Sequence, residues 1–373
     1  MRAIVTRPGE GRAWLEDIRE PSMSNADDVL VQMLRVGVCG TDRHVMQRAF
    51  DRGRRQLPDG DEFLVLGHEA VGRVLEVGPE ASPLKPGDVV VPTVRRGCGE
   101  CEACAVGQAD LCFTGRVRER GIVGLHGFLS ERIVEQAENL IRVSDDLSEV
   151  APLVESLCTP EKALRRIGNA RAHLPVEGLR NALVTGTGPI ALLAMLALRL
   201  RGVPTSVLAR QPVDGRAAQL VVDAGATYIP LSEVDLDHPQ ERLGGFDAIV
   251  EATGAAELGV AMLGALAPNG VLDLVGGGGR ASVPIQAGTL GAMVGRNLTL
   301  LGSVNANPDD WRRSVDDLAA MRKAFPGAVE ALITHRFEMQ DVDVAFERVP
   351  GQIKAVVNIM PSTSGRGVIQ GEG

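Results

Sequence analysis

The stretch Ala182-Leu183-Val184-Thr185-Gly186-Thr187-Gly188-Pro189-Ile190-Ala191 decides the fold of this chain. Its first four residues form a short apolar run that predicts a buried strand, and the apolar segment 190–200 predicts a helix directly after it. Residues 186–191 match the pattern G-x-G-x-x-[G/A]. Between a strand and a helix, the glycines allow a tight turn. The free backbone N–H groups and the positive end of the helix dipole at the helix N-terminus can then bind an anion. The stretch predicts a dinucleotide-binding unit, rather than a glycine turn kept for packing alone.

The segments that follow continue an alternation of strands and helices. Strands are predicted at Ser206–Ala209, Ala248–Glu251 and Val271–Val275, with a helix at Arg216–Ala224 between the first two. Alternation of this kind is typical of a doubly wound parallel sheet. Polar helices are expected after residue 304, and Lys354–Ile359 predicts a last strand before a polar, glycine-rich tail.

The first third of the chain has a different pattern, with short strands separated by glycine and proline. Val29–Val36, Ala70–Val77 and Val89–Pro92 are predicted strands, and Lys85–Asp88 is a predicted turn before the third. Such punctuation favours a compact β-rich domain. The fold class is therefore predicted to be α/β, with one β-rich domain and one parallel-sheet domain.

The end of the second strand of the dinucleotide unit indicates which cofactor it binds. NAD sites place an acidic residue there to hold the ribose 2′-hydroxyl, whereas here the strand is followed by Arg210. A guanidinium can clamp a 2′-phosphate, so NADP is favoured, with Arg216 as a second candidate contact. Asp214 can still serve a ribose hydroxyl, which keeps NAD open. Arg210 can also be read as a solvated surface charge.

Four cysteines stand close together at positions 98, 101, 104 and 112, with the spacing C-x2-C-x2-C-x7-C. Thiolates are soft ligands, and four of them close a tetrahedral shell around zinc. A closed shell leaves no position for substrate, so this zinc is expected to be structural. A disulfide framework is the alternative, and it is disfavoured in a long chain without a secretion signal.

A second group of metal-ligating residues is spread over three segments. Cys39 lies in Gly37-Val38-Cys39-Gly40-Thr41-Asp42, His68 lies in Gly67-His68-Glu69, and Glu155 lies in a later apolar stretch. A thiolate, an imidazole and a carboxylate can form an open, catalytic zinc site. Taken singly, His68 or Cys39 is more often a core residue than a ligand.

Together these motifs resemble those of the zinc-dependent medium-chain dehydrogenases of the alcohol and polyol dehydrogenase superfamily. The match Gly67-His68-Glu69-x-x-Gly72-x5-Gly78 and the cysteine lobe carry the resemblance, which covers nearly the whole chain. A narrower similarity is to archaeal-type glucose (aldose) dehydrogenases. It rests on segments 91–96 (VPTVRR), 119–122 (ERGI), 161–164 (EKAL) and 302–305 (GSVN).

The resemblance implies a domain arrangement. A GroES-like catalytic domain is expected over 1–181, with the structural zinc lobe at about 95–115. A Rossmann domain is expected over 182–304, and the chain should return to the catalytic domain over 305–373, with a flexible tail from about 362.

The resemblance also implies roles for individual residues. Cys39, His68 and Glu155 fall on the catalytic zinc positions, and Glu69 falls on the acidic neighbour that exchanges with water on the metal. Thr41 falls beside the substrate oxygen, and His44 falls on the proton relay. Glu119 and Asn305 fall on sugar contacts, with Asn305 also near the nicotinamide. The implied cofactor contacts are Gly186, Gly188, Pro189, Ile190, Arg210 and Arg216. Glu155 also borders the substrate.

Two departures from the family pattern concern the third zinc ligand. Ser156 stands where the family usually has proline after that ligand, and Cys158 lies three residues beyond Glu155. Cys158 can compete for the metal or be a buried bystander.

The implied reaction is transfer of hydride from C1 of a sugar, D-glucose above all, to NADP, or to NAD, giving a lactone. Two zinc ions per chain are implied, one structural and one acting as a Lewis acid, with the hydroxyl proton leaving through Thr41 to His44. The alternatives are a polyol, other-sugar or threonine-type dehydrogenase of the same superfamily, and a non-catalytic zinc-binding module.

Composition excludes several other classes. The chain has 373 residues, of which 45% are hydrophobic and 23% charged, and its net charge is −9. That balance is ordinary for a globular protein and disfavours a nucleic-acid partner. No apolar run reaches membrane-spanning length, and the N-terminus does not read as a signal peptide. A cytoplasmic enzyme is expected, assembled as a homo-oligomer of two or four chains by analogy with the family.

Overall fold

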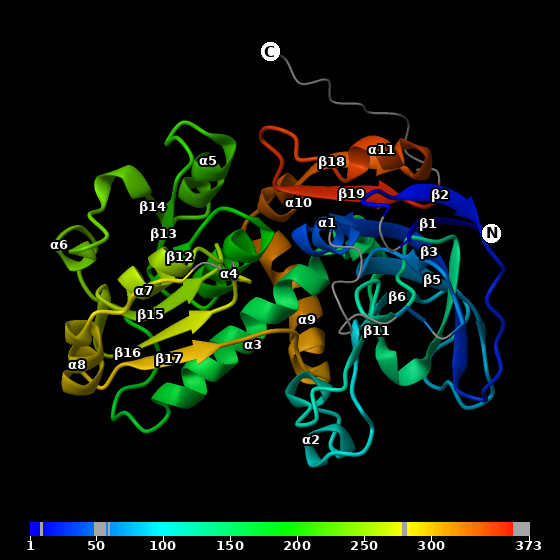
Figure 1. The fold of residues 1–373 in the computed structure, drawn as a ribbon, viewed down its shortest axis with the longest axis horizontal. Helices are drawn as coiled ribbons and strands as arrows, with labels where there is room; N and C mark the ends of the chain where they lie inside the picture. The colour runs from blue at the N-terminus through cyan, green and yellow to red at the C-terminus, as the bar shows by residue number, and fades with distance from the viewer. Residues whose placement is uncertain (8–9, 48–56, 59, 278–281, 361–373) are drawn as a thin grey trace. The chain divides into compact units, whose positions relative to one another are not determined.

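The computed structural model describes residues 1–7, 10–47, 57–58, 60–277 and 282–360. The chain forms two compact units: the first comprises Met1–Glu155 and Ile333–Gly373, and the second comprises Ser156–Leu332 (Figure 1). The predicted tail from 362 lies outside the described residues.

The first unit is built on a seven-stranded sheet with the order β11-β6-β5-β3-β19-β18, and β10 pairs with β3. The strands are β3 (Asp28–Val38), β5 (Glu69–Val77), β6 (Val89–Pro92), β10 (Arg132–Gln136), β11 (Leu140–Val143), β18 (Ile333–Glu338) and β19 (Lys354–Asn358). In the first half of β3, Val29, Val31 and Met33 are buried and alternate with less buried residues, as expected of a strand with one face on the core.

Two small sheets and short helices complete this unit. Their members are β1 (Arg2–Thr6), β2 (Trp14–Asp17) and β4 (Leu64–Val65) in one sheet, β7 (Arg95–Arg96), β8 (Arg118–Arg120) and β9 (Gly124–Leu125) in the other, and the helices α1 (Gly40–Gln47), α2 (Glu102–Ala105) and α11 (Val342–Ala345). Single 3-10 turns lie at Ala109–Leu111, Ala137–Asn139, Asp145–Leu147 and Met339–Asp341. One apolar core joins β1, β3, β5 and β19 and includes the fully buried Ile4, Phe128 and Val357.

The second unit contains a six-stranded parallel sheet with the order β14-β13-β12-β15-β16-β17. The strands are β12 (Ala182–Thr185), β13 (Thr205–Ala209), β14 (Thr227–Pro230), β15 (Phe246–Glu251), β16 (Leu266–Leu274) and β17 (Thr299–Gly302). The chain runs outward from β12 to β14 and then returns to place β15 on the other side of β12. Ligands of doubly wound folds bind at such a reversal, beyond the carboxyl ends of the strands.

Helices cover this sheet. They are α3 (Leu153–Arg171), α4 (Pro189–Leu200), α5 (Arg216–Asp223), α6 (Pro239–Leu243), α7 (Ala256–Met262), α8 (Ala287–Gly295), α9 (Pro308–Ala324) and α10 (Ala328–Leu332), with a 3-10 turn at Leu231–Glu233. Residues 191–198 of α4 are all fully buried, which explains why this helix is apolar on every side. The predicted α/β fold class, with a GroES-like and a Rossmann-type domain, is confirmed.

The boundaries of the units differ from the expected 181/182 and 304/305. Most of α3 belongs to the parallel-sheet unit, because Lys162 donates to the carbonyl of Val304 and Arg171 donates to that of Asn269. Helix α9 also belongs there, because Arg165 of α3 forms a two-bond ion pair with Asp310 of α9.

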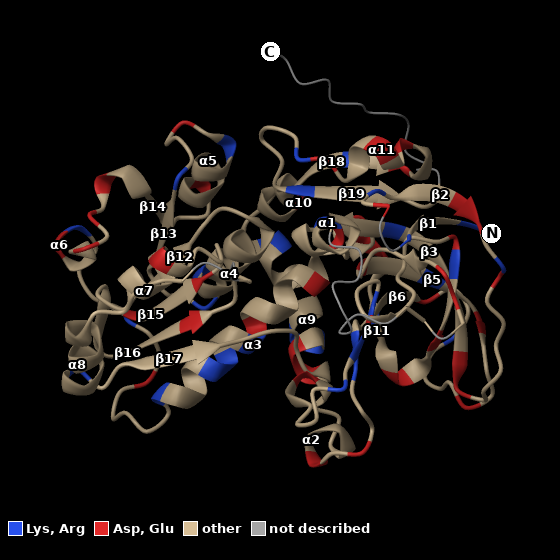
Figure 2. Ribbon diagram, viewed as in Figure 1, with Lys and Arg blue, Asp and Glu red and all other residues tan. Residues whose placement is uncertain are grey.

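Acidic and basic residues are interspersed along the described parts of both units (Figure 2). Among the described helices, none combines the length and the apolarity needed to cross a membrane.

Candidate active site and metal centres

The four cysteines of the predicted structural site meet in a lobe after β7. The ligand atoms of Cys98, Cys101, Cys104 and Cys112 all lie within 4.8 Å of one another, and all four are free thiols. Helix α2 begins directly after Cys101 and carries Cys104, and a Cβ at Gly97 would collide with the sulfur of Cys104. Four converging thiols without disulfides fit a closed zinc shell.

A second group joins Cys39, His68 and Glu69, whose ligand atoms also lie within 4.8 Å of one another. Cys39 follows β3, His68 precedes β5, and Glu69 is the first residue of β5. The register Gly37↔Glu69 between these strands brings the three residues to the same end of the sheet. The sulfur of Cys39 lies 3.0 Å from Nε2 of His68. A thiolate, an imidazole nitrogen and a carboxylate form a donor set suited to zinc.

Asp42 contacts both His68 and Cys39 and thereby orients these two candidate ligands. Its carboxylate lies 3.1 Å from Nδ1 of His68 and accepts the backbone N–H of Cys39 at 2.9 Å. Asp42 is fully buried. Burial opposes charge on His68, but Cys39 and Asp42 hold the pKa of His68 well above its ordinary value. A carboxylate on Nδ1 leaves Nε2 for the metal, the arrangement that zinc-binding histidines usually have.

Glu69 is held by a lysine from the other end of the chain. Nζ of Lys354, the first residue of β19, donates to Oε1 and Oε2 of Glu69, each at 2.6 Å. Both side chains are buried. Gly37 faces the same carboxylate, because a Cβ at that position would collide with Oε2 of Glu69.

Glu155 lies in the first turn of α3 and near this group. Burial raises the pKa of Glu155 to about 7, and the carboxylate of Glu69 adds to the rise while His68 opposes it. The three ligand atoms that lie within 4.8 Å of one another are those of Cys39, His68 and Glu69, so Glu155 is near the expected position without being one of the three. Cys158 is buried one helical turn further along α3.

Helix α1 presents the two predicted proton-transfer residues. Thr41 lies in its first turn, where its backbone N–H donates to the sulfur of Cys39 at 3.1 Å. His44 follows three residues later, and residues at this spacing lie on the same face of a helix.

The predicted sugar contacts lie in separate units. Glu119 is the middle residue of β8 and pairs with Arg95 at 2.8 Å. Asn305 follows β17 in a left-handed conformation with φ of 56°, and its Oδ1 accepts the N–H of Ala306 at 2.8 Å.

The glycine loop has the geometry that the sequence predicts. Gly186 adopts φ of 95°, which favours glycine, and Gly188 caps α4, with Pro189 at its first position and Ile190 next. Arg210 directly follows β13 and Arg216 begins α5, and both are exposed. The predicted cofactor residues of the glycine loop and Arg210 thus lie at the carboxyl ends of the neighbouring strands β12 and β13.

A buried glutamate next to this loop had no role in the sequence analysis. Glu251, at the end of β15, accepts the Thr185 hydroxyl at 3.1 Å and the N–H groups of Thr253 and Gly254 at 2.7 and 3.2 Å. It therefore ties the end of β12 to the loop after β15.

Sequence reasoning also missed Asp42 and Lys354 as supporting residues. The role of Lys354 could have been suspected from the sequence, because it is one of only four lysines and stands within an apolar strand. Such a lysine needs a buried anionic partner. Asp42 had a weaker signal, its place three residues after a candidate ligand.

Comparison with known proteins places these features in a family context. The model "Glucose dehydrogenase C-terminus" matches residues 148–359, and "Alcohol dehydrogenase GroES-like domain" matches residues 25–145. The glucose 1-dehydrogenase of Metallosphaera sedula is 35% identical over 96% of this chain and 98% of its own length. That of Methanocella arvoryzae is 33% identical over 96% of this chain and 99% of its own.

A solved structure is similar over nearly the same length. It is Haloferax mediterranei glucose dehydrogenase in complex with NADP, Zn and gluconolactone. The TM-score is 0.88 and the sequence identity 31%, and the match covers 97% of this chain and 100% of that one.

Proposed function

Because the chain belongs to the glucose dehydrogenase family of zinc-dependent medium-chain dehydrogenases, we propose that it oxidises D-glucose at C1 with NADP and releases the lactone. The observation that carries the proposal is the convergence of Cys39, His68 and Glu69 at one end of the main sheet, backed by buried Asp42 and Lys354. Zinc bound there would act as a Lewis acid on the C1 hydroxyl, and NADP would accept the hydride.

The protein's own residues orient the reactants and carry the proton. Asp42 fixes the ring of His68, and Lys354 holds Glu69. Glu69 is proposed to exchange with water on the metal, and Glu155 is proposed as the third ligand. As the C1–H bond breaks with its electron pair, the hydroxyl proton is proposed to pass through Thr41 to His44 and then to water. Glu119 and Asn305 are proposed to bind ring hydroxyls.

The preference for NADP rests on Arg210. It is exposed directly after β13, where an acidic residue would hold the ribose of NAD. Arg216 at the start of α5 is proposed as a second phosphate contact, and Asp214 leaves room for slower turnover with NAD.

Initial rates with a substrate panel test the proposal. D-glucose, D-galactose, D-xylose, sorbitol and L-threonine are each assayed with NADP and with NAD, and zinc is measured in the same preparation. We expect about two zinc ions per chain and the highest kcat/KM for an aldose with NADP. A preference for sorbitol or threonine would place the enzyme in another branch of the superfamily. One zinc ion per chain and no turnover would support a non-catalytic zinc-binding module. Light scattering on the same sample tests the proposed dimer or tetramer.

A further inference from the structure

The strand that carries Glu119 has two chemically different faces. β7 and β8 pair antiparallel with the register Arg95↔Glu119 and Arg96↔Arg118. Successive side chains of a strand point to opposite faces, so Arg95 and Glu119 share one face while Arg96 and Arg120 share the other.

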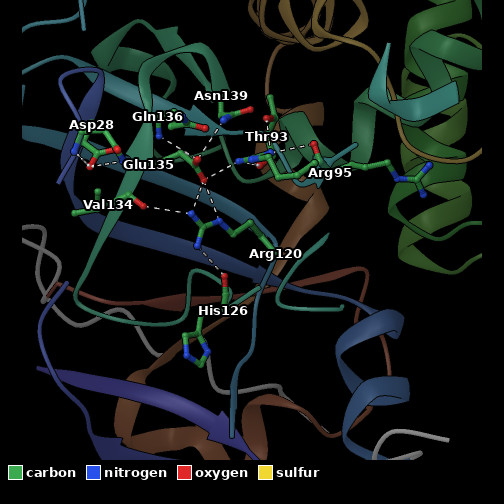
Figure 3. A network of polar contacts seen from close by, with 11 residues as sticks. Asp28, Thr93, Arg95, Arg120, His126, Val134, Glu135, Gln136 and Asn139 are labelled. Atoms are coloured by element: carbon green, nitrogen blue, oxygen red, sulfur yellow. Dashed lines mark hydrogen bonds and ion pairs between the residues drawn. The ribbon is translucent and has the colours of Figure 1, made fainter. Parts of the chain in front are cut away.

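A buried carboxylate fixes the second of these faces. Glu135 of β10 accepts from Nη2 of Arg96 at 2.6 Å. It also accepts from Nε of Arg120 at 2.9 Å (Figure 3). The amide of Asn139 and the N–H of Gln136 complete its hydrogen bonds, at 3.2 and 3.1 Å. Burial alone would raise the pKa of Glu135, but the two guanidinium groups hold it below its ordinary value. Because β10 belongs to the main sheet, this network ties the small strand pair to it.

On the first face, one guanidinium joins Glu119 to the cysteine lobe. Nε and Nη2 of Arg95 lie 2.9 and 2.8 Å from Oε1 of Glu119. Nη1 of the same group donates to the carbonyl of Asp110 at 3.3 Å. Asp110 lies between Cys104 and Cys112, inside the lobe. The two side chains are only 12% and 15% exposed, so the pair is largely shielded from water.

We propose that Arg95 is the positioning residue for Glu119 and uses the cysteine lobe as its anchor. Two bonds to Oε1 anchor that oxygen and therefore restrict the positions that Oε2 can take. The rigid fork of arginine can make these bonds and reach the lobe carbonyl together, which the single ammonium of a lysine cannot. The inference rests on the proposed role of Glu119 in sugar binding, and it assigns the lobe a part in sugar recognition besides stability.

Three variants test the proposal in the zinc-loaded enzyme with NADP. Arg95→Ala removes the fork, and Arg95→Lys keeps a positive charge without it. Arg118→Ala is the matched control, because Arg118 is an exposed arginine of β8 on the face opposite that of Arg95 and Glu119. For Arg95→Ala we expect the KM for glucose to rise about tenfold or more, with the KM for NADP within about twofold of wild type. The KM of Arg95→Lys for glucose should lie between those of wild type and Arg95→Ala. The KM of Arg118→Ala should match that of wild type.

A series of deoxyglucoses separates positioning from general damage. The wild-type enzyme should discriminate strongly against the one sugar that lacks the hydroxyl bound by Glu119. Arg95→Ala should lose most of that discrimination while binding as much zinc as wild type. The proposal is overturned if Arg95→Ala keeps the wild-type discrimination, or if it raises both KM values equally while losing zinc.

The variant Glu119→Gln distinguishes this inference from the proposed function. If Glu119→Gln changes neither the KM for sugar nor the discrimination among deoxyglucoses, the role of Glu119 fails, and the inference fails with it. If Glu119→Gln alters both and Arg95→Ala alters neither, only the role of Arg95 is wrong. Calorimetric binding of glucose to the complex with NADPH, which cannot accept hydride, gives the same comparison without turnover.

Discussion

Nζ of Lys354 donates to both carboxylate oxygens of Glu69 across 285 positions of sequence, with each bond 2.6 Å long. The pair joins the start of β19 to the start of β5, next to Cys39 and His68. Burial would lower the pKa of Lys354, but the interactions with Glu69 and the nearby Cys39 and Glu155 together raise the pKa above its ordinary value. Strand β19 therefore contributes to the candidate metal centre.

Lys354→Met should destabilise the protein, because it leaves Glu69 buried without its cation. Removal of one partner of a buried ion pair costs about 3–5 kcal/mol, which denaturant unfolding can measure. Lys85→Met is the control, because Lys85 is exposed. The double variant Lys354→Met with Glu69→Gln should recover part of the loss. A single variant as stable as the control would contradict a structural role for the pair.

Cys39→Ser should abolish turnover and lower bound zinc from about two ions to about one per chain, because a hydroxyl is a much poorer zinc ligand than a thiolate. Elemental analysis and circular dichroism of the purified variant check both the loss and the fold. Cys158→Ser should keep both zinc ions if Glu155 completes the site. Normal activity of Cys39→Ser would refute the ligand assignment.

Arg210→Ala should raise the KM for NADP by about tenfold or more, because a 2′-phosphate loses a charge-assisted contact. The KM for NAD, which lacks that phosphate, should change little. Initial rates with both cofactors measure the two values, and Arg312→Ala on α9 serves as the exposed-arginine control. An equal change for NADP and NAD would mean that the phosphate is held elsewhere.

Glu161 should make the stability of the protein fall as pH rises. Burial raises its pKa to about 7 from the ordinary 4.5, and the Asp317 carboxylate adds to the rise while Arg201 opposes it. Between these values the folded state keeps a proton that the unfolded state has released. The stabilisation from Glu161 is therefore complete below about pH 4.5 and is lost as pH rises through about 7.

Unfolding free energies at pH 5 and pH 8 check this expectation in wild type and in Glu161→Gln. The difference between the two pH values should be smaller in the variant, on the order of 2 kcal/mol. Glu257→Gln changes an exposed carboxylate and should behave as wild type. If the unfolding free energy changed equally between pH 5 and pH 8 in wild type and in Glu161→Gln, the result would count against the prediction.

The sequence was informative where function depends on local pattern. The glycine loop, the cysteine spacing and the strand–helix alternation are contained in short windows, and the fold predicted from them is confirmed. The family and the class of reaction, which the resemblance implies, are also confirmed. Contacts between distant segments could not be read in this way. The Lys354–Glu69 pair and the Arg95–Glu119 pair depend on strand order and register, which local periodicity does not give. The division of the chain at 155/156 and 332/333 depends on packing in the same way, because α3 and α9 are assigned by their contacts.

The burial of Lys354 also has a practical consequence for attaching this protein to surfaces. Of the four lysines in the chain, Lys162 and Lys354 are each only 2% exposed, which leaves Lys85 and Lys323 on the outside. Reagents that acylate amines would therefore modify few positions, and none of those positions is a candidate site residue. An activated resin should therefore attach the protein through Lys85, Lys323 or the terminal amine of Met1, which leaves the candidate site residues unmodified on a biosensor electrode or in a flow reactor.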